Sequence, residues 1–337
     1  MPRFTLVTGA GGEMGHSMLE AFAHRGNRAV VAVDLSALQP EQAAHCHTVL
    51  QGDVSDPALV QQLEQFNFEE IYHLAALLST SAEKFPEKAH NVNVNGTMGL
   101  LMMARRIGQR TGTPVKFLFP STIAVYGLPS IAEKAAAGRV KETQYCEPIT
   151  MYGINKLYCE QLGSYVSDHM GQLTEDMSVK YVDFRGVRFP GLISAFTVPT
   201  GGTSDYAPEM IHAVAQGKPY ACFVRPDTRI PFMAMPDGVR AIMELADAPA
   251  SSLTRRMYNI AAFAPSAEEI ATQVKVAYPD AVITYAPHER RQAIVDSWCA
   301  DANDEAARAD WGWKPFYDMG AAFNDYLIPN IANVYAG

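Results

Sequence analysis

Short apolar runs alternate, along the first half of the chain, with longer segments in which apolar residues recur at helical spacing. The apolar runs cover residues 4–8, 29–34, 48–50, 71–74 and 116–121. Helical spacing predicts a first helix that ends near Arg25 and further helices over 93–106 and 151–164. Such alternation is typical of a parallel sheet with helices on both faces. The run 29–33 is apolar at every position, as a strand covered on both faces requires.

After Ile193 the pattern changes to shorter elements joined by connections rich in Pro and Gly, and residues 230–246 return to a strand followed by an amphipathic helix. We therefore predict an α/β protein with a doubly wound parallel sheet and a smaller C-terminal α/β domain. The first domain is expected over residues 1–185, rejoined by about 230–260. The second is expected over 186–229 and 261–337.

The composition excludes several classes of protein. The net charge of −9 comes without a basic cluster, so we expect no nucleic-acid partner. No apolar run approaches the roughly 20 residues that cross a bilayer. The N-terminus lacks the apolar stretch of a secretory signal, so we expect a cytoplasmic protein. Five cysteines without a C-x-x-C pair suggest buried thiols, and neither disulfides nor a metal site.

A glycine-rich turn follows the first predicted strand and opens the first predicted helix, over residues 8–15. This context favours a dinucleotide site, in which Gly9 allows a tight turn, Gly12 lets the backbone approach a pyrophosphate, and Gly15 lets the helix pack against the strand. Glu13 and Met14 would place their backbone N–H groups at the positive end of the helix, facing the phosphates. A plain glycine turn is the alternative.

The second predicted strand ends at Asp34, about 20 residues beyond the turn, where a carboxylate accepts hydrogen bonds from the adenosine ribose. The same carboxylate would repel the 2′-phosphate of NADP, and Leu35 and Ser36 supply no cation, so NAD is the predicted cofactor. A capping role for Asp34 is the alternative. The remaining predicted cofactor contacts follow the third and fourth strands: Asp53, Val54, Leu74, Ala75 and Ala76.

Tyr152 and Lys156 are four residues apart in a predicted helix, so their side chains share a face. A nearby ammonium favours the phenolate and lowers the pKa of a tyrosine, which predicts Tyr152 as a general base. Ser121 and Thr122 end a predicted strand at the sheet edge where α/β proteins bind ligands, so Thr122 could hold a substrate oxygen. A surface helix pair and a turn of hydroxyl residues are the alternatives.

These motifs together resemble the extended short-chain dehydrogenase/reductase family, marked by this glycine turn, a Ser or Thr before Val125-Tyr126-Gly127, and Y-x-x-x-K. The resemblance implies a Rossmann fold in the first domain, which would bind NAD, and a substrate-binding second domain. It also implies that Thr122, Tyr152 and Lys156 are the catalytic residues, that Tyr152 and Lys156 also contact the cofactor, and that Asn93 supports Lys156 through water.

Nearly the whole chain resembles the L-threonine 3-dehydrogenases of the short-chain type, in segments 73–79, 151–153, 188–194, 201–207, 228–233, 296–298 and 307–313. The chain departs from that pattern at Thr200, Ser204 and Cys299. The resemblance implies that Tyr152 takes the proton of the threonine C3 hydroxyl while a hydride passes to NAD, giving 2-amino-3-oxobutyrate without a metal. It also implies a homodimer formed through helices 93–110 and 151–170.

Hydroxyl groups in these segments would suit the carboxylate of a small zwitterion. The predicted substrate contacts are Ser79, Ser121, Thr122, Tyr152, Gly191, Thr203 and Ser204. Two other functions stay open. A nucleotide-sugar epimerase or dehydratase would need cations for a pyrophosphate, which Arg185, Arg188, Arg225 and Arg229 could supply, and a non-catalytic NAD sensor would use the same fold.

Overall fold

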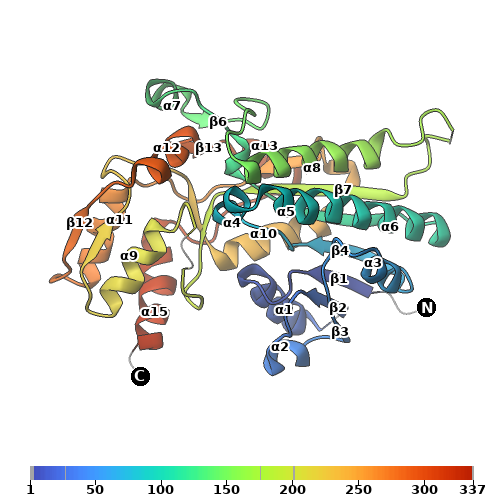
Figure 1. Ribbon diagram of the computed structural model, residues 1–337, viewed down its shortest axis with the longest axis horizontal. Helices are drawn as coiled ribbons and strands as arrows, with labels where there is room; N and C mark the ends of the chain where they lie inside the picture. The colour runs from blue at the N-terminus through green and yellow to red at the C-terminus, as the bar shows by residue number, and fades with distance from the viewer. Residues whose placement is uncertain (1–3, 27, 175, 200–201, 336–337) are drawn as a thin grey trace. The chain divides into compact units, whose positions relative to one another are not determined.

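The chain divides into two compact units, whose elements are labelled in Figure 1. The computed structural model describes residues 4–26, 28–174, 176–199 and 202–335. Unit 1 comprises Met1–Ser121, Ile154–Val187 and Ala241–Met257. Unit 2 comprises Thr122–Gly153, Arg188–Arg240 and Tyr258–Gly337.

Unit 1 is built on a seven-stranded parallel sheet with the strand order β11-β7-β5-β4-β1-β2-β3. The order runs outward from β1 in both directions, which is the doubly wound arrangement that the sequence predicted, so the predicted fold class is confirmed. The strands are β1 (Phe4–Thr8), β2 (Ala29–Asp34), β3 (Thr48–Gln51), β4 (Phe68–His73), β5 (Val115–Thr122), β7 (Val182–Phe189) and β11 (Met257–Asn259).

Strand β4 begins three residues before the predicted start at 71, because its first part contains charged residues. Glu70 is buried there at 2% exposure. Its carboxylate pairs with Arg28 at 3.1 Å and with Lys116 at 3.4 Å, both within unit 1. A buried carboxylate needs such partners. The apolar pattern could not reveal this part of the strand, since the compensating cations are distant in sequence.

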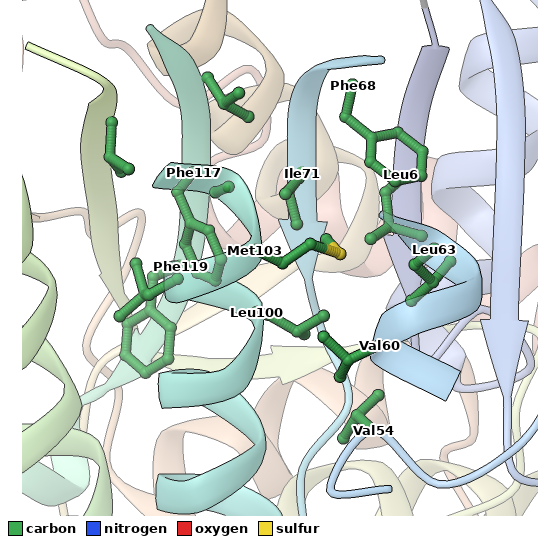
Figure 2. Packing of buried hydrophobic residues seen from close by; sticks show 14 of the residues in the cluster. Leu6, Val54, Val60, Leu63, Phe68, Ile71, Leu100, Met103, Phe117 and Phe119 are labelled. Carbon is green, nitrogen blue, oxygen red and sulfur yellow. The ribbon is translucent and has the colours of Figure 1, made fainter. Parts of the chain in front are cut away.

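One face of the sheet is covered by α3 (Pro57–Leu63), α6 (Gly96–Thr111) and α8 (Met151–Asp168). Figure 2 shows how side chains from these layers interlock: Leu6, Ile71 and Phe117 of the strands meet Val60 and Leu63 of α3 and Leu100 and Met103 of α6. A π-helical segment, Asn91–Asn95, leads directly into α6. The predicted helix starting at 93 therefore exists, and continues to Thr111, where Gly112 ends it at a φ of 70°.

The opposite face carries α1 (Glu13–Arg25) and the end of α10 (Met235–Asp247). Alternation along β4 explains the division, because Tyr72 points away from its neighbour Ile71. The Tyr72 ring packs edge-on against Phe22 of α1, with ring centroids 5.3 Å apart. Arg25 pairs with Asp247 at 2.9 Å. The short helices of unit 1 are α2 (Pro40–Ala44), α4 (Ser79–Lys84) and α5 (Pro86–His90).

In its described residues, unit 2 contains three pairs of short parallel strands. These are β6 (Arg139–Val140) with β13 (Asp301–Ala302), β8 (Gly191–Ile193) with β10 (Phe232–Ala234), and β9 (Tyr220–Cys222) with β12 (Ile283–Tyr285). Its main helices are α7 (Ile131–Ala137), α9 (Tyr206–Ala215), α11 (Ala267–Ala277), α12 (Glu289–Ser297), α13 (Glu305–Trp311) and α15 (Ile328–Tyr335).

The observed units differ from the predicted domains mainly at one segment, and also over residues 230–240, which belong to unit 2. Thr122–Gly153, expected in the first domain, belongs to unit 2. The contacts explain why: β6 pairs with β13, Tyr126 donates to Asn259 Oδ1 at 2.6 Å, and Asn259 donates to the Val140 carbonyl at 2.9 Å. The return to unit 1, expected by about 230–260, covers Ala241–Met257.

The cysteines differ in part from the prediction of buried thiols. All five are free, and Cys159, Cys222 and Cys299 are buried, whereas Cys46 and Cys146 are partly exposed. Among the described residues, no group of three or more His, Cys, Asp or Glu side chains could hold a metal ion. In the same part of the chain, no helix is long and apolar enough to span a bilayer.

Candidate active site

The turn between β1 and α1 requires glycine at two positions for steric reasons. Gly9 has a φ of 69°, and a Cβ there would lie 2.7 Å from the Ala75 backbone nitrogen. A Cβ on Gly15 would lie 2.3 Å from the Gly9 carbonyl oxygen. These distances are far below van der Waals contact. The predicted roles of Gly9 in the tight turn and of Gly15 in close helix packing therefore have a direct geometric basis.

Helix α1 begins without a side-chain cap. Its N-cap residue is Gly12, which has no side-chain oxygen to accept from the first helical N–H groups. The Gly12 nitrogen donates to the Gly9 carbonyl at 3.1 Å, which closes the turn. A helix N-terminus of this kind attracts an anion through its dipole and backbone N–H groups. The predicted phosphate contacts at Glu13 and Met14 lie in its first turn.

Asp34 is held beside this turn by two backbone groups. Its Oδ2 accepts from the Gly11 nitrogen at 2.9 Å, and its Oδ1 accepts from the Ser36 nitrogen at 3.0 Å. The carboxylate is partly exposed, and Leu35 beside it is 63% exposed. The structural role of Asp34 and its predicted role at the ribose are thus compatible. The carboxylate organises the turn and keeps lone pairs that could accept from a ribose hydroxyl.

Asp53 closes a local turn before α3. Its Oδ1 accepts from the Ser55 nitrogen at 2.8 Å and from the Ser55 hydroxyl at 2.7 Å. These bonds match the turn role that the sequence left open, and the contact to adenine stays a prediction. Val54, the other predicted contact here, is buried against Gly96 at the start of α6.

His73, at the end of β4, is a structural residue. Its Nδ1 lies 2.8 Å from the Thr8 hydroxyl and its Nε2 lies 2.9 Å from the Thr97 hydroxyl. Burial and the nearby charge of Lys156 lower the pKa of His73 to about 3. The ring is therefore neutral at neutral pH. It fixes the strand end from which the backbone continues into Leu74, Ala75 and Ala76.

Asn93 anchors that continuing segment. Its Oδ1 accepts from the Leu77 nitrogen at 2.8 Å, and its Nδ2 donates to the Leu77 carbonyl at 3.0 Å. The same Nδ2 donates to Asn155 Oδ1 at 3.3 Å, which ties it to α8. This direct link reaches the residue beside Lys156. The predicted water between Asn93 and Lys156 stays a prediction.

Lys156 lies buried on α8, four residues after Tyr152. Its Nζ donates to the Pro120 carbonyl at 2.7 Å and lies 4.5 Å from the centroid of the Phe119 ring. Burial lowers the pKa of Lys156 to about 8, and the charges of Cys159 and Glu160 oppose that shift. The hydrogen bond to Pro120 thus fixes the Lys156 amine at the end of β5. Its pKa depends on the negative charges nearby.

The pKa of Tyr152 departs from the sequence prediction. Burial raises this pKa well above its ordinary value, whereas the spacing to Lys156 predicted a lowered one. Desolvation of the phenolate by burial is the cause of this rise. The role of Tyr152 as a general base stays a prediction.

Ser121 is hydrogen-bonded within the protein. Its hydroxyl donates a short hydrogen bond to the carboxylate of Glu160, which is buried at 1% exposure. Glu160 lies one helical turn after Lys156 and was not among the predicted residues. The signal was present in the sequence, since the spacing Y-x-x-x-K continues as K-x-x-x-E. The role of Ser121 as a substrate contact stays a prediction, and in it the hydroxyl would act as an acceptor.

Thr122 caps the short 3₁₀ segment Ile123–Val125, where its Oγ1 accepts from the Ala124 nitrogen at 3.1 Å. A hydroxyl that accepts still has its own hydrogen to donate. Thr122 therefore remains able to donate to a substrate oxygen, as predicted.

The predicted substrate contacts of the second half lie in two places in unit 2. Thr203 is buried and Ser204 partly buried, in the turn before α9. Gly191 begins β8, where a Cβ would lie 2.6 Å from the Phe232 ring, so packing alone explains this glycine. Ser79 begins α4 in unit 1 and is partly buried. Thr200 and Gly201 lie outside the described residues.

The four arginines that could have served a pyrophosphate all have partners within the protein. Two of them are almost completely buried, Arg185 at 2% and Arg188 at 3% exposure. The partners are Asp183 and the Leu245 and Ala248 carbonyls for Arg185, Tyr126 and the Glu142 carbonyl for Arg188, Asp296 and Asp227 for Arg225, and Glu269 for Arg229.

Comparison with known proteins identifies the class. The chain belongs to the NAD dependent epimerase/dehydratase family, whose model matches residues 5–261. It is therefore an NAD-dependent enzyme, as the glycine turn and Asp34 predicted.

The similarity to individual proteins extends over nearly the whole chain. The mitochondrial L-threonine 3-dehydrogenase of Bos taurus is 33% identical over 317 residues, covering 93% of this chain and 79% of that protein. The holo form of an L-threonine dehydrogenase from Cupriavidus necator has a TM-score of 0.84 at 34% identity, covering 98% and 99% of the two chains. A monomeric L-threonine 3-dehydrogenase of metagenomic origin has a TM-score of 0.85 at 35% identity, covering 98% and 100%.

Proposed function

We propose that this enzyme oxidises the C3 hydroxyl of L-threonine to 2-amino-3-oxobutyrate with NAD as the hydride acceptor. The similarity to L-threonine dehydrogenases along the whole chain supports the substrate. The observation that favours threonine over a nucleotide sugar is that Arg185, Arg188, Arg225 and Arg229 each bind groups of the protein itself. A pyrophosphate would have to displace these partners.

The residues of unit 1 fit NAD. The uncapped start of α1 at Gly12 suits a pyrophosphate, and a Cβ on Gly12 would already approach the Gly9 carbonyl to 3.2 Å. Asp34 offers a fixed carboxylate to the ribose and would repel a 2′-phosphate. NAD, when bound, supplies the acceptor for the hydride from C3.

Helix α8 carries the two residues proposed for acid–base chemistry. Tyr152, as the phenolate, would remove the proton from the C3 hydroxyl, and protonated Lys156 would stabilise that phenolate. Lys156 is positioned for this by the Pro120 carbonyl, and the buried carboxylate of Glu160 favours its charged form. Thr122 would donate to the substrate oxygen and orient it.

The zwitterionic end of threonine needs donors for its carboxylate. We propose the hydroxyls of Thr203, Ser204 and Ser79 for this task, since the hydroxyl of Ser121 donates to Glu160. Hydroxyl donors suit a substrate whose net charge is zero, since a buried arginine would bind the carboxylate at the expense of the neighbouring ammonium.

Tyr152→Phe tests the assignment. We expect NADH formation from L-threonine to fall at least about a hundredfold, the lower range for a lost general base, with the Kd for NAD unchanged. Tyr165→Phe, further along α8, is the matched control and should keep wild-type turnover. NADH absorbance is followed with L-threonine and, separately, with uridine diphosphate sugars. Rapid NADH formation by Tyr152→Phe, or no response of the wild type to threonine, contradicts the proposal.

We also propose a homodimer formed through α6 and α8, in the cytoplasm. Three large apolar side chains of these helices, Met98, Ile154 and Tyr158, are 38%, 48% and 55% exposed. Exposed side chains of this kind favour association where they form a common patch. The solved relative of metagenomic origin is described as monomeric.

A further inference from the structure

The turn that carries two of the proposed substrate contacts is closed by its own hydrogen bonds. It consists of Gly202, Thr203, Ser204 and Asp205 and leads directly into α9. The Asp205 nitrogen donates to the Gly202 carbonyl at 3.2 Å, and the Gly202 nitrogen donates to Asp205 Oδ2 at 2.6 Å. On its other side, residues 194–199 form neither helix nor strand. Of the described residues on its two sides, only those of α9 therefore have regular structure.

Arg291, on α12, reaches this turn from 89 residues further along the chain. Its guanidinium donates a short hydrogen bond to the Gly202 carbonyl, the same oxygen that accepts from Asp205. Arg291 thus reinforces the closing bond of the turn from outside. The sequence did not single out Arg291, because nothing in its local pattern distinguishes it from Arg290 beside it.

The guanidinium of Arg291 is fixed from two further directions. Its central carbon lies 3.2 Å from the centroid of the Phe223 ring, and its Nη2 lies 3.8 Å from Glu209 Oε1 on α9. Glu209 is in turn held by the Tyr220 hydroxyl at 2.9 Å. A planar guanidinium that already stacks on a ring and pairs with a carboxylate loses little further conformational entropy when it donates to a carbonyl. Arg291 is therefore a preorganised tether and not a mobile surface charge.

We propose that Arg291 is a positioning residue for the substrate. By holding the Gly202 carbonyl it fixes the turn, and the turn fixes the hydroxyls of Thr203 and Ser204 for the threonine carboxylate. Arg291 acts through the turn and makes no contact with the reacting atoms. The inference rests on the proposed function for the identity of the substrate, while the tether itself depends only on the contacts within unit 2.

Steady-state kinetics of Arg291→Ala, Arg291→Lys and Arg290→Ala test the role. Arg291→Ala should raise KM for L-threonine about tenfold, the loss expected for one charge-assisted hydrogen bond, with kcat and the Kd for NAD each within about twofold of wild type. Arg291→Lys keeps the charge without the planar fork, so an intermediate KM is expected. Arg290 is exposed, and Arg290→Ala should match the wild type.

Hydrogen exchange of the amides of residues 202–206 without substrate gives a second readout. Protection should fall in both Arg291 variants and stay unchanged in Arg290→Ala. If the wild type does not oxidise threonine, the proposed function fails, and the exchange data still show whether Arg291 holds the turn. Unchanged KM and unchanged exchange in Arg291→Ala overturn the inference. So does a loss confined to kcat or to NAD binding, since that would indicate a role other than positioning the turn.

Discussion

Replacing Gly15 with alanine adds one methyl group where α1 passes over the turn that follows β1. The new Cβ would lie 2.3 Å from the Gly9 carbonyl oxygen and 2.6 Å from the Ala10 carbonyl oxygen. Both are backbone atoms that cannot rotate away. Since carbon and oxygen normally stay more than about 3 Å apart, the helix start has to retreat by roughly 1 Å. That movement breaks the bond from the Gly12 nitrogen to the Gly9 carbonyl.

The expected magnitude combines two opposing terms. Alanine is preferred over glycine inside a helix by about 1 kcal/mol, whereas forcing an extra group into a packed site costs about 1–3 kcal/mol. A net loss of folding stability of up to about 2 kcal/mol follows. The affinity for NAD should fall at least about tenfold, because the start of α1 is the proposed pyrophosphate site.

Gly99→Ala is the matched control, since Gly99 also lies within a helix, α6. A Cβ there would have its nearest neighbour, Val60 Cγ2, at an ordinary 3.7 Å. This variant should be as stable as the wild type or up to about 1 kcal/mol more stable. Urea unfolding and calorimetric NAD titration measure both effects. A Gly15→Ala protein with wild-type stability and NAD affinity would refute the steric argument.

Two further predictions concern stability and assembly. Because the pKa of His73 is lowered to about 3 from 6.5, the folded chain binds fewer protons than the unfolded chain between these values. The contribution of neutral His73 to the free energy of unfolding is therefore complete above pH 6.5. It is lost as the pH falls toward 3, by up to about 1.4 kcal/mol per pH unit. His73→Gln should flatten this part of the pH dependence measured by urea unfolding, and an equal slope in both proteins would contradict the assignment. Sedimentation velocity should show a dimer that Tyr158→Glu converts to a monomer, whereas a monomeric wild type would exclude the proposed interface.

Features encoded locally were predictable from the sequence. The spacing of apolar residues gave β1, β2 and α8 because strand and helix periods are set by neighbouring positions. The glycine turn and Asp34 predicted NAD for the same reason: the motif is contiguous or lies at a fixed separation.

Features that depend on distant partners were not predictable in this way. The start of β4 was missed because Glu70 is neutralised by Arg28 and Lys116. The pKa of Tyr152 was predicted in the wrong direction because spacing reports the cation but not the burial. The hydrogen bond between Ser121 and Glu160 was not predicted because the two residues lie 39 positions apart.

The two backbone hydrogen bonds that Asp34 accepts limit how this enzyme could be redesigned for a different coenzyme. Removing the carboxylate to admit a 2′-phosphate also removes the acceptor for the backbone nitrogens of Gly11 and Ser36. An exchange to alanine would therefore leave two amides to find water and would loosen the turn. Asparagine keeps one acceptor oxygen, so a change of coenzyme would have to start from a residue at position 34 that can still accept a hydrogen bond. The cation for the 2′-phosphate would then be introduced at Leu35 or Ser36.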